Sequence, residues 1–194
     1  MDMSNAVVLL VDDTHEKLKN EGRRNTMISP ELRKSIDNYL SQHYLPEENE
    51  QTTYIFQDNI TKDTKKQQSD DAAVSLSQLM KEVGASFHDT LFAKIDASGM
   101  TDVDIYKRAN IDRKLFSKIR SNPAYHPRKQ TVLALAIALQ LSLDDTIDFL
   151  SRAGYAFSPS SKGDLIVKYF IERGVYDITA INFALNEYEQ QVLE

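Results

Sequence analysis

Residues 74–194 repeat one local pattern, and this repetition restricts the fold more than any other feature of the chain. A residue that can cap a helix comes first, apolar residues follow at spacings of three and four, and a glycine often ends the segment. Ser86, for example, precedes four apolar residues at helical spacing, and Gly99 follows them. Because this spacing places apolar side chains on one face of a helix, we predict a mainly α domain over residues 74–194.

The other predicted helices of this domain obey the same rule. Capping residues place helix starts at Ser75, Thr101, Asp112, Ser142, Ser161 and Asp177, and an apolar run adds a helix over 129–140. For the last three helices, the predicted inward residues are Ile147 and Leu150, then Ile166, Tyr169 and Phe170, then Ile181, Leu185, Tyr188 and Val192. We expect the two helices within 162–192 to extend the core, with a dimer surface as the alternative.

Residues 101–120 predict two short helices joined by a tight turn. Thr101 caps the first helix, over about residues 102–109, and Asp112 caps the second. Asn110 lies between them, and asparagine tolerates the left-handed backbone that a helix end often needs. Apolar residues of the unit that we expect to face inward are Ile105, Ala109, Ile111, Phe116 and Ile119.

The second of these helices lies in a block of positive charge. The whole chain has a formal net charge of −6, but residues 91–130 hold nine Lys and Arg against four Asp and Glu, a net charge of +5. Non-specific affinity for nucleic acid comes from neutralised phosphates, so a local basic block matters more than the total charge. A solvated basic helix face is the alternative interpretation.

These residues resemble the helix-turn-helix of lambda-repressor-like (XRE-type) regulators. Ile105 and Ala109 match the core positions of the family's first helix, and Asn110 stands at its turn glycine. Ile111, Phe116 and Ile119 match the remaining apolar positions, and residues 131–155 are similar to the fourth and fifth helices of that fold. The resemblance covers roughly residues 86–155. It implies a lambda-repressor-like helical bundle, here with two extra C-terminal helices.

The resemblance implies a sequence-specific transcriptional regulator whose partner is double-stranded DNA. The second helix would read base edges through Arg113, Lys114, Ser117 and Lys118. Phosphate contacts are expected from Lys107, Arg108, Arg120, Arg128 and Lys129. Many such regulators act as dimers, so a second copy of the chain, or another protein, is the further partner that we consider.

The chain also departs from the family pattern. Asp102 stands where the family often has a glutamine that touches a DNA phosphate, and Tyr106 stands where alanine is preferred. Residues 121–128 make a longer link to the next helix than the family usually shows. Asp102, the acidic total charge and the parts at both ends of the chain that lie outside the family pattern support an alternative function. This is a protein-interaction adaptor that keeps the fold without binding DNA, for example in a multiprotein or defence complex.

Residues 1–57 form a small N-terminal segment of unknown role that could be α+β. Apolar runs at 6–11 and 53–56 are strand candidates. Between them, Ser29 caps a helix predicted over 30–44, with an apolar stripe at Leu32, Ile36, Tyr39, Leu40 and Tyr44. Residues 58–73 are polar and charged, which predicts a linker to the helical domain.

Nothing in the sequence predicts an enzyme, a cofactor or a metal site. The chain has no Cys, and its four His residues form no His-Glu-x-x-His motif, so we expect neither thiol chemistry nor a zinc site. No apolar run approaches the roughly 20 residues of a membrane span. The N-terminus lacks a basic region before an apolar stretch, so we expect no secretory signal. A cytoplasmic protein without a membrane partner is the expectation.

Overall fold

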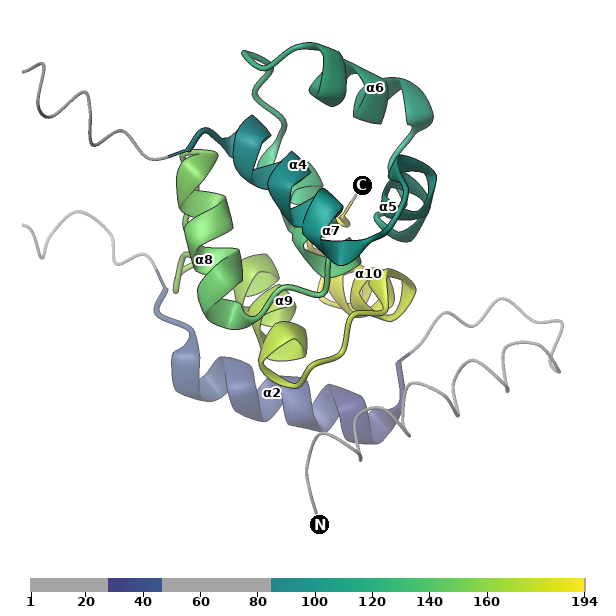
Figure 1. The fold of residues 1–194 in the computed structure, drawn as a ribbon. Coiled ribbons are helices and arrows are strands. Elements are labelled where there is room, and N and C mark those ends of the chain that lie inside the picture. Colours follow the sequence, from purple (N-terminus) through teal and green to yellow (C-terminus); the bar gives the residue numbers. More distant parts are fainter. Residues whose placement is uncertain (1–27, 47–84, 194) are drawn as a thin grey trace, which may run out of the picture. The chain divides into compact units, whose positions relative to one another are not determined.

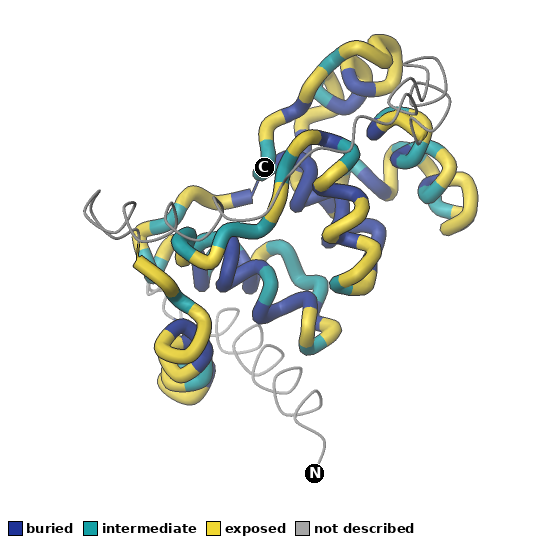
Figure 2. The backbone as a smooth tube through the Cα atoms, turned by 90° about the vertical axis from the view of Figure 1, so that its left-hand side faces the viewer, coloured by how far each residue is buried: buried dark blue, intermediate teal, exposed yellow. Residues whose placement is uncertain are grey.

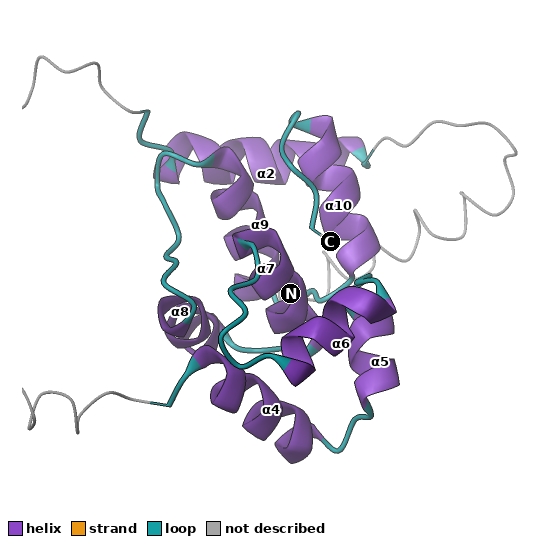
Figure 3. Cartoon of the chain, turned by 90° about the horizontal axis from the view of Figure 1, so that it is seen from above, coloured by secondary structure: helices purple, strands orange, loops and turns teal. Residues whose placement is uncertain are grey.

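The structure, a computed structural model, describes residues 28–46 and 85–193, and every regular element in these two ranges is a helix (Figures 1 and 3). In chain order the helices are α2 (Pro30–His43), α4 (Phe87–Ser98), α5 (Asp102–Arg108), α6 (Arg113–Ser121), α7 (Lys129–Ala138), α8 (Leu143–Arg152), α9 (Lys162–Glu172) and α10 (Ile178–Glu187). All of them belong to one compact unit. The mainly α fold that the sequence predicts is confirmed for these residues.

Side-chain caps fix the start of most helices. At each predicted cap within the described ranges, the side chain accepts a hydrogen bond from a backbone N–H of the first turn; these caps are Ser29, Ser86, Thr101, Asp112, Ser142, Ser161 and Asp177. Helix α7 differs, because its N-cap residue Arg128 makes no side-chain cap bond. Burial of an apolar run, rather than capping, therefore stabilises α7.

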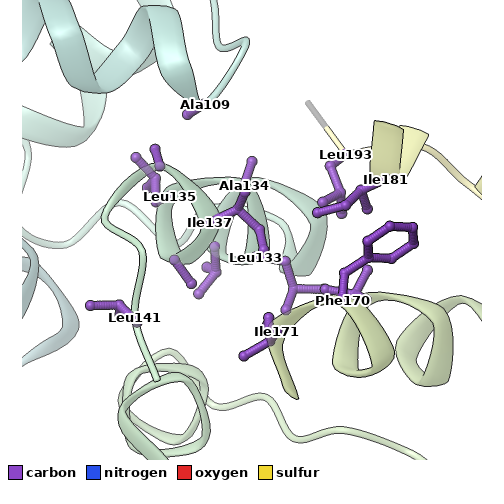
Figure 4. Packing of buried hydrophobic residues seen from close by; sticks show 14 of the residues in the cluster. Ala109, Leu133, Ala134, Leu135, Ile137, Leu141, Phe170, Ile171, Ile181 and Leu193 are labelled. Carbon is purple, nitrogen blue, oxygen red and sulfur yellow. The ribbon is translucent and has the colours of Figure 1, made fainter. Parts of the chain in front are cut away.

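Helix α7 is the centre of the hydrophobic core. Every residue from 131 to 139 is buried, and the helix packs against α5, α8 and α10. Figure 4 shows its side chains between Ala109, which follows the last residue of α5, on one side and Phe170 of α9 and Ile181 of α10 on the other. Exposed residues lie on the outer turns of the surrounding helices (Figure 2). Helix α7 thus holds the α4–α6 region and the C-terminal helices in one core.

The two C-terminal helices extend this core, as predicted. Ile166, Tyr169 and Phe170 are fully buried in α9, and Ile181 is fully buried in α10. The two helices pack against each other, and α9 also packs against α8. Their apolar faces are therefore covered by the chain itself.

Helix α2 is part of the same core. The predicted stripe is buried at Leu32, Ile36, Tyr39 and Leu40, while Tyr44 is half-buried, and the helix packs against α9. Polar contacts reinforce this packing. The Tyr169 hydroxyl donates to Ser35 Oγ over 2.8 Å, and Arg33 forms an ion pair with Glu187 over 2.6 Å. A hydrogen bond thus joins α2 to α9, and an ion pair joins it to α10.

Two inward predictions are wrong. Ile147 is 48% exposed, because α8 turns Thr146, Phe149 and Leu150 inward instead. The last helix ends at Glu187 and does not reach Val192, which is exposed. There the chain reverses and buries Leu193, whose N–H donates to Asn182 Oδ1 over 2.7 Å.

Other predictions fall outside the described residues. These are the strand candidates at 6–11 and 53–56, the linker at 58–73 and the helix that begins at Ser75. The proposed boundaries of the N-terminal segment and of the linker lie there as well.

Candidate nucleic-acid interface

Helices α5 and α6 form a tight corner whose geometry follows from local sequence signals. Thr101 and Asp104 form a capping box at the start of α5, in which each side chain bonds the other residue's backbone N–H. The hydrogen bond from the Thr101 hydroxyl is also the main reason why the pKa of Asp104 lies below its usual value. Asn110 then takes the left-handed conformation, with φ of 53°, and the Ile111 N–H bonds the Tyr106 carbonyl over 2.9 Å.

Apolar side chains beneath α6 determine which face points outward. Phe116 and Ile119 are buried on the inner side of this helix, as predicted. The Phe116 ring has two aromatic neighbours, with ring centroids 6.3 Å away for Phe92 and 6.0 Å away for Tyr106. Rotation of α6 about its own axis would expose these side chains, so the orientation of its outer face is fixed.

The outer face of α6 is cationic and open to solvent. Arg113, Lys114, Ser117 and Lys118 are all exposed. Within the described residues neither Arg113 nor Lys114 forms an ion pair, while the Lys118 ammonium lies 4.2 Å from the centre of the Tyr125 ring. The nearest acid in sequence, Asp112, has its carboxylate engaged as the α6 cap, accepting from the Lys114 N–H over 2.6 Å. Two adjacent cations at the first turn of α6 are therefore available to a ligand.

The predicted phosphate contacts divide into two groups. Lys107 and Arg108 are exposed at the end of α5, and Arg128 is exposed just before α7. The other two bind acids of the chain. Lys129 forms an ion pair with the buried Asp164, which already neutralises its charge. Arg120 forms one with Asp102 over 3.1 Å.

An open groove separates α5 from α6. It encloses about 410 Å³ and is lined by Asp102, Val103, Tyr106, Arg113, Phe116, Ser117 and Arg120. Val103, Tyr106 and Phe116 give the lining apolar and aromatic side chains, and Arg113 and Arg120 give it guanidinium groups. The groove thus adjoins the cationic face of α6, and Asp102 is the acid among its lining residues.

Sequence reasoning missed the contacts that join distant parts of this surface. Asp102 and Arg120 lie on different helices, so spacing within one helix does not predict their ion pair. His88 of α4 bonds the Arg120 carbonyl through Nε2 over 3.1 Å, at the C-terminal end of α6. The Tyr155 hydroxyl donates to the Pro127 carbonyl over 3.0 Å and so holds the link after α6. Such contacts depend on the tertiary fold, and only the polar or aromatic character of these residues was visible in the sequence.

Comparison of the chain with protein-family models, with curated proteins and with solved structures finds no match in any of the three. In the described ranges, no helix combines the length and the apolar character that spanning a bilayer requires.

Proposed function

We propose that this protein is a sequence-specific DNA-binding transcriptional regulator that acts in the cytoplasm through a lambda-repressor-like helix-turn-helix formed by α5 and α6. The observation that carries the proposal is the outer face of α6, where Arg113, Lys114, Ser117 and Lys118 are exposed together on a helix anchored from beneath. A major groove about 12 Å wide admits an α-helix, and arginine or lysine at its N-terminal end can reach the acceptors of guanine.

The acidic total charge is compatible with this function. The positive block at 91–130 includes the corner and the link that follows it, whereas the flanking regions carry the negative charge. Figure 1 shows α6 at the top of the described unit, with α2 at the opposite side. A duplex approaching the outer face of α6 would meet the exposed Arg113, Lys114 and Lys118. Lys107, Arg108 and Arg128 are the candidates for the flanking phosphates.

Titration with a duplex selected from a random DNA pool tests this proposal. The affinity should fall steeply as salt is raised, because bound phosphates release counterions. The double substitution Arg113→Ala and Lys114→Ala should lower it about 100-fold or more, since each lost base or phosphate contact contributes about 1–3 kcal/mol. Lys34→Ala, which removes an exposed lysine on α2, is the matched control for Lys114→Ala and should bind like the unmodified protein.

One observation favours the second candidate function, a protein-interaction adaptor. Val103 is 44% exposed and lines the groove between α5 and α6 together with the half-buried Tyr106. The apolar part of this groove can also accept an apolar side chain of a protein partner. If no duplex binds even at low salt, the adaptor becomes the better proposal, and Val103→Asp should then abolish the interaction with the protein partner.

A further inference from the structure

We propose that Asp102 limits the affinity of this interface for the DNA backbone by holding Arg120 in an ion pair that a phosphate must displace. This inference rests on the proposed function and adds a residue that sets binding strength. Its starting point is that Arg120, one of the two arginines that line the α5–α6 groove, already has an anionic partner.

The side chain of Arg120 is held by contacts with two other helices. Its guanidinium lies 3.1 Å from Asp102 Oδ1 at the start of α5, and 4.5 Å from the centre of the Phe92 ring of α4. Its side chain is still 49% exposed and that of Asp102 is 36% exposed. The pair is therefore held in place yet reachable from solvent, so an incoming anion can compete for the guanidinium.

The groove beside this pair can accept a phosphate. Arg113, Ser117 and Arg120 line it, and they offer guanidinium and hydroxyl donors of the kind that bind phosphate oxygens. Asp102 lines the same groove. A phosphate that binds both arginines must first displace the Asp102 carboxylate from Arg120, and the energy of that ion pair offsets part of the attraction. Removing the carboxylate charge should convert this weak phosphate site into a strong one.

The start of α5 does not depend on Asp102 for its cap. Thr101 and Asp104 form the complete capping box, and Asp102 takes no part in it. The carboxylate of Asp102 can therefore be neutralised while the cap that begins the helix stays intact. A change in DNA affinity in Asp102→Asn then reports electrostatics rather than unfolding of α5.

The first experiment compares Asp102→Asn with the unmodified protein on a random-sequence duplex of 30 base pairs. One additional phosphate contact makes the slope of log K against log salt steeper by about 0.9, which corresponds to about eightfold tighter binding at 0.1 M salt. The same gain is expected on a selected duplex, because phosphate contacts carry no sequence information. Asp144→Asn is the matched control: it removes an exposed first-turn acid on α8 and should change neither the slope nor the affinity by this amount.

The second experiment combines Asp102→Asn with Arg120→Ala. Because the gain requires the freed guanidinium, the double variant should bind no more tightly than Arg120→Ala alone. If Asp102→Asn binds more tightly even without Arg120, general charge repulsion accounts for the effect and the proposed competition is wrong. An unchanged salt slope in Asp102→Asn would overturn the inference as well.

Failure of this inference can be told apart from failure of the proposed function. Suppose that the unmodified protein binds duplex and that the double variant with Arg113→Ala and Lys114→Ala does not. The proposed function is then supported, whether or not Asp102→Asn changes the affinity. If neither the unmodified protein nor the Asp102→Asn variant binds duplex at low salt, the proposed function is wrong and so is this inference.

Discussion

The ammonium of Lys129 forms an ion pair with the carboxylate of Asp164, and this contact joins the first residue of α7 to the first turn of α9. The Asp164 side chain is only 8% exposed, and it also accepts the Ser158 N–H over 2.7 Å. A buried carboxylate needs such partners because its charge is poorly solvated. The pair therefore stabilises the junction between the α4–α8 region and the C-terminal helices.

Lys129→Met should destabilise the protein by about 2 kcal/mol, since it leaves a buried carboxylate without its cation. The methionine keeps the apolar stem, so the loss reflects charge rather than volume. Adding Asp164→Asn to this variant should restore part of the stability, because the amide oxygen can still accept the Ser158 N–H. Urea unfolding followed by circular dichroism measures both changes. Equal midpoints for Lys129→Met and the unmodified protein would contradict the prediction.

The features predicted correctly from sequence are those that neighbouring residues decide. The sequence predicts Ser29 and Asp177 as caps because a cap needs only a side-chain acceptor before the first turn. The sequence also predicts Asn110 at the α5–α6 turn, because asparagine tolerates the left-handed backbone found there. The outward face of α6 followed from spacing alone, because Phe116 and Ile119 share its opposite side.

The features that were missed depend on residues distant in sequence. Ile147 has the spacing of an inward residue with Leu150, yet the packing of α8 buries Phe149 instead. The last helix has apolar residues as far as Val192, but the bonds between Asn182 and Leu193 turn the chain back after Glu187. At the candidate site, the sequence does not predict the Asp102–Arg120 ion pair, because it forms between residues that are distant in sequence.

Asn110→Gly should leave the protein as stable as before or stabilise it slightly, whereas Asn110→Val should destabilise it by about 1–2 kcal/mol. The reason is the φ of 53° at this position, which glycine adopts freely and a β-branched residue does not. Thermal unfolding of the two variants measures the difference. If valine is tolerated as well as glycine, the turn between α5 and α6 does not have the left-handed geometry described.

Ile147→Gln should change the unfolding free energy by less than about 0.5 kcal/mol, while Phe149→Ala should lower it by about 3–5 kcal/mol. The two residues are neighbours on α8, but the first is 48% exposed and the second is fully buried against Phe87, with ring centroids 5.0 Å apart. Chemical denaturation of both variants at one pH makes the comparison. A large loss for Ile147→Gln would mean that a partner surface, and not solvent, covers this side of α8.

Two tyrosines at the α2 contact should make the fold sensitive to alkaline pH. Burial raises the pKa of both Tyr39 and Tyr188 above the usual value, and for Tyr188 the hydrogen bond that its hydroxyl donates to Asp37 over 2.7 Å raises it further. Both hydroxyls therefore favour the neutral form in the folded state. A pKa that is higher in the folded than in the unfolded chain contributes stability below the unfolded value of about 10, and this contribution is lost as pH rises above it.

We therefore expect the unfolding free energy of the unmodified protein to fall between pH 9 and pH 11. In the double variant with Tyr39→Phe and Tyr188→Phe, we expect this decrease to be smaller. At pH 8 the double variant should be less stable by about 1 kcal/mol, because the Tyr188–Asp37 hydrogen bond is lost. The fall itself should be smaller, because no phenol remains at these positions to ionise when the chain unfolds. Tyr125→Phe, at a half-exposed residue that contacts Lys118 rather than α2, serves as the control and should show the full fall. Denaturant titrations at each pH provide the measurement, and an identical pH dependence in all three proteins would show that α2 does not bury these hydroxyls in solution.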